Sequence, residues 1–329
     1  MRVVSLLFAT AVTAAAPAAS SGQDANFLLP VDQIETLLRE GALEIISVTP
    51  SRGLPAERTY QVTVKAGEGQ MLQMKYAPAR PGADEFNNRP RYELAAYEFQ
   101  KLFLDPAEYV VPPTVGRCFP LDEVRAVLAM APSADLIDPP VPTFDGWNMG
   151  FVVLQYWLWN IEVPDPRDLD DDDRLADQVY ERHAGNFNLL THLIRHGDSN
   201  QGNFLLSTDP QNPRVFSVDN GVAFSSEESD RGYYWRDLRL DRYPRESIDR
   251  LRAYTLEDLY ARLGVVAQFE IRGAAFVQTE PGENLDPNDG VRRSDSVVQF
   301  GLTASEIRSI HDRITRLIGW VDDGRYQVF

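Results

Sequence analysis

Two short apolar runs, each bounded by turn residues, limit the folds open to this 329-residue chain more than any other feature. The turn HGDSNQGN precedes FLL at 204–206, and the turn DNG follows VFSV at 215–218. Runs of this length, separated by Asp-Pro-Gln-Asn-Pro, predict a β-hairpin. Because both flanking turns lie at the same end of such a hairpin, we expect Asp198, Asn203 and Asp219 to meet there.

These three side chains carry oxygen atoms suited to one kind of chemistry. The carboxylate of Asp198 can face an incoming hydroxyl group, while Asp219 and the amide oxygen of Asn203 can share a divalent cation. Such ligands suit Mg²⁺ or Mn²⁺, which keep several waters and bridge substrate phosphates. For Asp198 and Asn203 alone, an Asx-turn pair without catalytic function is an equal alternative.

The order His196-Gly-Asp198, Asn203 and Asp219-Asn-Gly221 resembles the H-x-D-x-x-x-x-N and D-x-G motifs of the protein-kinase-like superfamily. The HGD form is similar to aminoglycoside and choline phosphotransferases. The VDNG form is similar to phosphatidylinositol 3-/4-kinases and to the secreted Golgi casein kinase group. The resemblance covers roughly residues 43–260 and implies a two-lobed α+β fold, with an antiparallel-sheet N-lobe and a mostly helical C-lobe.

The resemblance also implies a lysine on the third strand that holds the α/β-phosphates of the nucleotide, and a glutamate on the next helix that orients this lysine. The chain has three lysines, and Lys75 ends the strand-like run QMLQMKY at 70–76. Glu93 follows on the next predicted helix. Lys65 is the alternative lysine, before a turn, and Glu98 is the alternative partner, one helical turn further along.

A nucleotide-covering loop would occupy residues 49–58, which contain a single glycine, so the G-x-G-x-x-G pattern is missing. Ser51, Arg52 and backbone amides are the phosphate contacts that remain there. The resemblance places the adenine-binding hinge at the end of the apolar run that closes with Gln155, Tyr156 and Trp157.

Hydrophobic periodicity predicts the elements that frame these motifs. We expect a helix over 31–40, strands over 43–49, 59–64 and 70–76, an amphipathic helix over 91–103, a buried strand over 151–157, and helices over 174–195 and from 304 onward. Residues 162–174 read as an acidic connector, and the rest of the second half reads as helical and loop-rich. The prediction is an N-lobe at 24–150 and a C-lobe at 151–329, with a cleft between them.

The first 18 residues, with Arg2, a short apolar run and an Ala-x-Ala site, predict a signal peptide and therefore a periplasmic or secreted protein. The alternative is a buried N-terminal helix. The formal charge of −17 argues against nucleic-acid binding, and no apolar stretch suggests a stable membrane span. A single cysteine, Cys118, excludes a disulfide within the chain and a thiolate zinc site.

The sequence therefore favours an exported kinase-like phosphotransferase that uses ATP or another nucleotide with Mg²⁺ or Mn²⁺. Asp198, Lys75 and Glu93 would be catalytic, Asn203 and Asp219 would hold the cation, and a protein, lipid head group or small molecule would supply the hydroxyl acceptor. Three alternatives remain: a pseudokinase that binds a nucleotide or partner protein, a nucleotidyl transferase on the same fold, and a metal-dependent hydrolase that uses Asp198 and Asp219.

Overall fold

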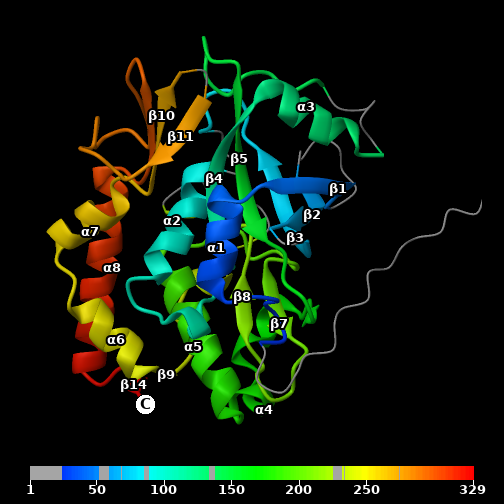
Figure 1. The fold of residues 1–329 in the computed structure, drawn as a ribbon. Coiled ribbons are helices and arrows are strands. Elements are labelled where there is room, and N and C mark those ends of the chain that lie inside the picture. Colours follow the sequence, from blue (N-terminus) through cyan, green and yellow to red (C-terminus); the bar gives the residue numbers. More distant parts are fainter. Residues whose placement is uncertain are drawn as a thin grey trace, which may run out of the picture.

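The computed structural model describes residues 24–329 except 52–58, 68, 85–88, 133–137, 225–231, 233 and 274. The predicted signal peptide and Arg52 lie outside the described residues. Figure 1 shows a sheet-based lobe above a helix-rich lobe, with the C-terminal helices running along one side of both.

A five-stranded antiparallel sheet forms the first lobe. Its strands are β1 (Leu43–Pro50), β2 (Tyr60–Ala66), β3 (Gln70–Pro78), β4 (Thr114–Pro120) and β5 (Met149–Tyr156), in the order β1-β2-β3-β5-β4. The predicted three-strand meander is confirmed, since β1 pairs with β2 and β2 with β3. Because β5 pairs with both β3 and β4, this sheet continues past residue 150, where we placed the lobe boundary, to Tyr156.

One face of this sheet packs on two helices, α1 (Val31–Glu40) and α3 (Leu121–Ala129). The alternation of side chains explains the packing: Val62 and Val64 on β2 are buried in that core, whereas Lys65 between Val64 and Ala66 faces solvent.

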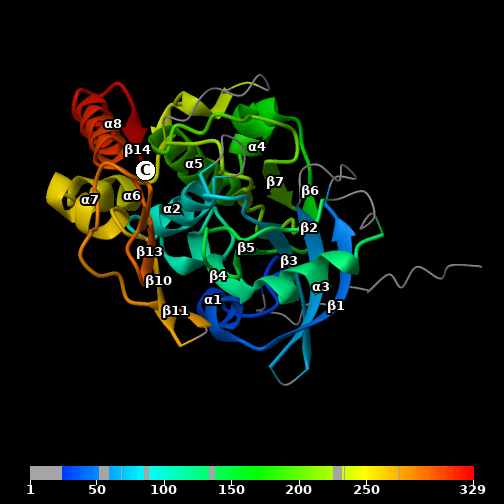
Figure 2. The same ribbon diagram turned by 90° about the horizontal axis from the view of Figure 1, so that it is seen from above.

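The helix after β3 is α2 (Pro90–Gln100), three residues shorter than expected at its C-terminus. The prediction that this helix is amphipathic is wrong, because nearly all of its described side chains are buried, including Arg91 and Glu93. Tertiary packing is the reason: α2 belongs to a core shared with α5 (Gln178–Leu193) and α8 (Ala304–Asp322). Seen from above, α2 lies between the sheet and the C-terminal helices (Figure 2).

The second lobe begins with a small antiparallel sheet of β6 (Ile161–Glu162), β7 (Phe204–Ser207) and β8 (Val215–Ser217), which contains the predicted hairpin. The helix predicted over 174–195 is two helices, α4 (Asp172–Leu175) and α5. Asp177 separates them because its side chain caps α5, accepting from the amides of Val179 and Tyr180. Val179, expected on the buried stripe, is exposed.

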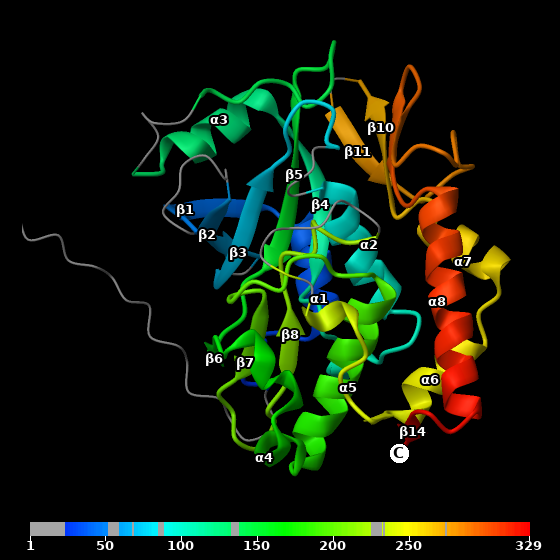
Figure 3. The ribbon, with the colours of Figure 1, turned by 180° about the vertical axis from the view of Figure 1, so that it is seen from behind.

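The C-terminal part contains helices α6 (Arg245–Arg252), α7 (Leu256–Leu263) and α8, and α8 begins at the predicted capping box of Thr303 and Glu306. Figure 3 shows α6 and α7 alongside α8. Two-residue strands β9 (Arg242–Tyr243) and β14 (Gln327–Val328) pair in parallel. Short 3₁₀ helices cover Pro106–Glu108, Pro166–Asp170 and Tyr234–Arg236.

A second antiparallel sheet was not predicted in this helical and loop-rich region. It contains β10 (Ala267–Arg272), β11 (Ala275–Thr279), β12 (Val291–Arg293) and β13 (Val297–Phe300), in the order β11-β10-β13-β12. Its strands have three to six residues, and charged side chains interrupt the apolar pattern of β10 and β12. The sheet is buried against the remaining face of the first one, where Phe151 of β5 stacks on Phe300 with ring centroids 4.1 Å apart.

The architecture is therefore α+β and two-lobed, as predicted, with an extra sheet on the back of the N-lobe. Among the described residues, no helix has the length and apolarity required to cross a membrane.

Candidate active site

The β7–β8 hairpin brings its two flanking turns together. Phe204 pairs with Ser217 in the ladder, and beyond it the amide of Val218 donates to the carbonyl of Asn203 at 3.1 Å. A further backbone bond, 2.7 Å from the amide of Gly197 to the carbonyl of Val222, joins the HGD turn to the segment after DNG. The two motifs thus form one connected surface.

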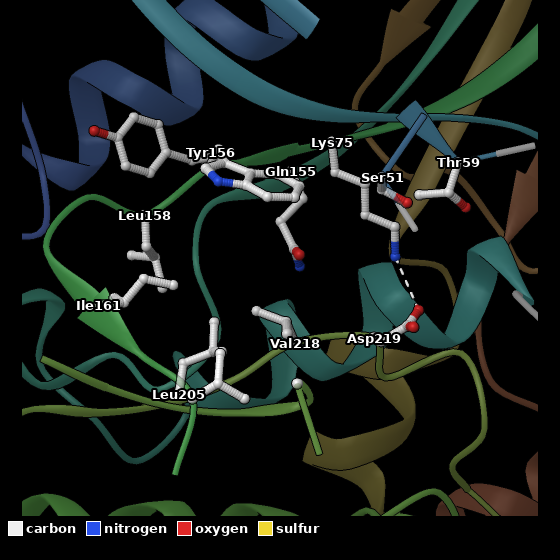
Figure 4. Close-up of a pocket in the computed structure, with 13 residues that line it drawn as sticks. Ser51, Thr59, Lys75, Gln155, Tyr156, Leu158, Ile161, Leu205, Val218 and Asp219 are labelled. Atoms are coloured by element: carbon white, nitrogen blue, oxygen red, sulfur yellow. Dashed lines mark hydrogen bonds and ion pairs between the residues drawn. The ribbon is translucent and has the colours of Figure 1, made fainter. Parts of the chain in front are cut away.

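Lys75 links the lobes at this surface. Its Nζ lies 2.8 Å from Oε1 of Glu93 on α2 and 3.0 Å from Oδ1 of Asp219 (Figure 4 shows the latter contact). Burial by itself would lower the pKa of Lys75, but the carboxylates of Asp219 and Glu93 outweigh burial and raise it, so the amine stays charged. Side chains distant in sequence are therefore held together as predicted.

The alternative residues are engaged elsewhere. Half of the Lys65 side chain is exposed, and its nearest carboxylate, Glu44, is 3.8 Å away. Glu98 pairs with Lys101 at 2.8 Å on the outer side of α2. The geometry therefore favours Lys75 and Glu93 over Lys65 and Glu98.

The DNG turn has a constrained backbone. Asp219 has a φ of 62°, in the left-handed region that non-glycine residues seldom occupy. The next residue holds it there: the amide of Asn220 donates to Oε2 of Glu93 at 3.1 Å, and its side chain accepts from the hydroxyl of Ser217 at 2.8 Å. Asn220 thus shapes the turn, and Glu93 binds both Lys75 and the turn that carries Asp219.

Asp198 and Asn203 also lie in contact. The Asn203 amide nitrogen donates to the backbone carbonyl of Asp198 at 3.1 Å and to its Oδ2 at 3.2 Å. These bonds fix the orientation of the Asn203 amide: its nitrogen faces Asp198, and its Oδ1 is directed away from Asp198. Both residues are buried.

His196 is fully buried behind the loop and is not a base or ligand in this arrangement. Burial lowers its pKa to about 4, which makes the ring neutral at pH 7. Its Nδ1 accepts from the amide of Asp198 at 3.3 Å, which places the proton on Nε2. The imidazole therefore supports the loop that positions Asp198.

A cavity of about 210 Å³ opens beside Lys75 and Asp219 (Figure 4). Ser51, Thr59, Gln155 and Gly202 also line it. Its remaining wall is mostly apolar and contains Tyr156, Trp157, Leu158, Ile161, Val163, Leu205 and Val218. Asp198 and Asn203 are not among the residues that line it. Leu205 and Val218, which were not predicted as site residues, form the apolar floor, and their place on the two strands of the predicted hairpin is the signal that could have identified them.

The predicted hinge lines this cavity, but the backbone amides expected to contact a base are partly occupied. The amide of Tyr156 donates to Pro113 and that of Trp157 to Gln73, both at 2.9 Å. The Tyr156 ring stacks on Phe27, with centroids 5.4 Å apart, away from the cavity. The Leu158 amide, next in the chain, makes no hydrogen bond within the described residues. Of these three hinge amides, that of Leu158 is therefore the one available to donate to a bound base.

Gln155 differs from its neighbours because its side chain points into the cavity (Figure 4). It is paired with Lys75 across β3 and β5, and its amide nitrogen donates to the hydroxyl of Thr114 at 2.9 Å. Gln155 therefore forms the back wall between the hinge and the lysine.

The residues predicted to hold a cation fit a hard divalent ion. Asn203 and Asp219 contribute oxygen atoms at the same end of the hairpin, which is the ligand type that such an ion prefers. The described residues contain no group of three or more His, Cys, Asp or Glu side chains arranged to hold a metal. Two protein oxygens suit Mg²⁺, which takes its remaining ligands from water and substrate phosphates.

No protein-family model matches the sequence, and no curated protein is significantly similar to it. Among solved structures, the chain is similar to hydra Fam20 determined with a sugar. The TM-score is 0.55 and the identity is 14%, over 89% of this chain and 88% of that one. The comparison shows that this chain shares the two-lobed α+β fold of that structure.

Proposed function

We propose that this protein is an exported phosphotransferase that moves a phosphoryl group from ATP, or another nucleotide, to a hydroxyl acceptor. The observation that carries the proposal is the position of Lys75, a charged and buried amine between Glu93 and Asp219 at the wall of a cavity. A buried cation fixed by two carboxylates can bind phosphate with little reorganisation.

The residues take separate roles in this reaction. Lys75 neutralises the α/β-phosphates, and Glu93 keeps its amine in position. The apolar floor and the Leu158 amide hold the base at the hinge. Asp198, oriented by Asn203, aligns the acceptor hydroxyl and takes its proton as the new oxygen–phosphorus bond forms and the nucleoside diphosphate leaves.

Asn203 and Asp219 would hold Mg²⁺ or Mn²⁺, which supplies neutralisation of charge on the transferring phosphate. Asp219 then has two partners, Lys75 and the cation, and its left-handed backbone directs the carboxylate toward the cavity. Because Glu93 holds both Lys75 and the amide of Asn220, one carboxylate on α2 aligns both phosphate-binding groups.

A pseudokinase is the second candidate. The observation that favours it is that Asp198 is buried and does not line the cavity. Calorimetry with ATP and Mn²⁺, paired with a turnover assay on the same sample, separates the two: nucleotide binding without product formation assigns the pseudokinase.

The test of the phosphotransferase is transfer of ³²P from ATP to a panel of acceptors. The panel contains proteins, lipid head groups and sugars, the last because the hydra Fam20 structure contains a sugar. We expect Asp198→Asn and Asp219→Asn to abolish transfer, whereas Asp173→Asn, an exposed carboxylate on α4, retains it. Transfer that survives both site variants would rule out the assigned roles.

A further inference from the structure

A second cavity, of about 360 Å³, lies on the other side of the HGD loop, between the end of α5 and α8 (Figure 3 shows both helices). Its ionisable lining consists of Arg195, Arg236, Arg313, Arg316, His192, Asp237 and Asp312. Four arginines face two aspartates, while the whole chain has a formal charge of −17. Burial lowers the pKa of His192, so that the ring adds no charge at neutral pH. Among the residues that line this cavity, arginines thus outnumber aspartates, although the protein as a whole is acidic.

Two of these arginines, Arg313 and Arg316, have donors that the described residues leave unused. Arg313 donates through Nε to the carbonyl of Leu193 at 2.8 Å, but its buried Nη2 has no hydrogen-bond partner among the described residues. Arg316 makes no ion pair within the described part of the chain. Burial, followed by repulsion from Arg195 and Arg316, lowers the pKa of Arg313 to about 10. A buried guanidinium donor without an acceptor is costly unless a ligand supplies one.

Backbone geometry provides an independent observation. Arg195 has a φ of 54° directly after the last turn of α5, where helices most often place glycine. An arginine at this position keeps a strained backbone while adding a fourth guanidinium to the cavity. An arginine at position 195 is not needed to cap the end of α5, because the Nε of Arg313 already donates to the carbonyl of Leu193 in the last turn of that helix.

The cavity is connected to the active-site loop. A side chain built at Gly197 would place its Cβ 3.5 Å from Nη2 of Arg236. Next to it, the amide of Trp235 donates to the hydroxyl of Ser199 at 3.3 Å. Arg195 directly precedes His196. The cavity arginines therefore lie next to the segment that carries Asp198: Arg195 directly precedes it, and Arg236 lies beside Gly197 and follows Trp235, which bonds to Ser199.

We propose that this cavity binds a phosphate group, either as the free ion or on a phosphorylated side chain, and that the bound group steadies the loop 195–199. Guanidinium groups bind phosphate oxygens through paired charge-assisted hydrogen bonds, which matches a cluster of arginines with an unused donor. This site is separate from the nucleotide cavity and is expected whether or not phosphoryl transfer occurs.

The test is isothermal titration with inorganic phosphate at constant ionic strength, using chloride as the counter-titrant. We expect saturable binding to the full chain that persists in Lys75→Gln, which disables the nucleotide site, and in Arg308→Gln, another arginine on α8 that contacts Tyr260 instead. The double variant Arg313→Gln/Arg316→Gln should weaken binding at least about tenfold. Arg195→Gly, which suits the local φ, provides a second variant that should fold and also bind more weakly.

Absence of saturable binding, or binding lost in Lys75→Gln and kept in Arg313→Gln/Arg316→Gln, overturns the site. Titration with O-phosphoserine distinguishes the two sources: tighter binding than inorganic phosphate indicates a phosphorylated side chain, and equal or weaker binding indicates the free ion. Phosphate should also slow amide hydrogen exchange at 195–199 in the wild type and not in the double variant. Phosphate binding with unchanged exchange refutes the link to the loop.

Discussion

Replacing Lys75 with methionine tests the arrangement at its centre. The change removes the cation that lies 2.8 Å from Glu93 and 3.0 Å from Asp219, while keeping most of the apolar volume. The Glu93 side chain is 3% exposed, so water cannot replace the lost partner; the Asp219 side chain is 26% exposed and suffers less. Breaking a buried pair in this way lowers the free energy of unfolding by about 3–5 kcal/mol.

Urea denaturation at pH 7 measures this loss, and Lys65→Met is the matched control. Lys65 is half exposed and 3.8 Å from Glu44, so its removal should change stability by less than about 1 kcal/mol. If the cost arises from uncompensated charge, adding Glu93→Gln to Lys75→Met should restore part of it. Equal stability of the single and double variants would refute that reasoning.

The same variant reports on ligand binding. Loss of one charge-assisted contact to phosphate should weaken ATP binding by roughly 10–100-fold in calorimetry with Mg²⁺. Lys65→Met should bind ATP as the wild type does. If Lys75→Met binds ATP with undiminished affinity, the phosphates do not lie against Lys75 and the proposed function loses its main support.

Three other changes have defined outcomes. The pKa of His196 is about 4 in the folded state and 6.5 in the unfolded chain, so the unfolded state binds a proton first and the free energy of unfolding falls as the pH drops from about 6.5 to 4. His196→Gln should reduce this loss of stability by about 3 kcal/mol, measured by urea denaturation at both pH values. Gln155→Ala should open the back wall and improve binding of an N6-benzyl ATP relative to ATP by about tenfold in competition titrations, and an unchanged preference would place the base elsewhere. Arg91→Met should destabilise by about 3–5 kcal/mol in thermal or urea unfolding, because Arg91 and Glu306 form a buried pair at 2.7 Å; a change below about 1 kcal/mol would show that the pair does not hold α8 to α2.

Local sequence was sufficient wherever a pattern is governed by neighbours along the chain. The three-strand meander, the β7–β8 hairpin and the capping box of α8 follow from alternation, turn residues and side-chain-to-backbone bonds within a few residues. The candidate site could be predicted for the same reason. A hairpin places its flanking turns together, and Lys75 and Glu93 lie on consecutive elements.

These local patterns do not predict contacts between segments that are distant in the sequence. The burial of α2 on all sides depends on α8 and α5, and the sheet of β10–β13 depends on packing against Phe151 of β5, far away in the sequence. The occupied amides of Tyr156 and Trp157 likewise depend on Pro113 and Gln73 in neighbouring strands.

By itself, the order of residues determined which polar side chains would lie near one another: an acid, an amide and a second acid at one end of a hairpin, preceded by a lysine and a glutamate. Only the tertiary structure decided that the amine of Lys75 is buried and shared by two carboxylates, and that four arginines gather behind the loop of Asp198. The physical reason is that burial and electrostatic interaction depend on distance in space, whereas periodicity and turn chemistry depend on distance along the chain.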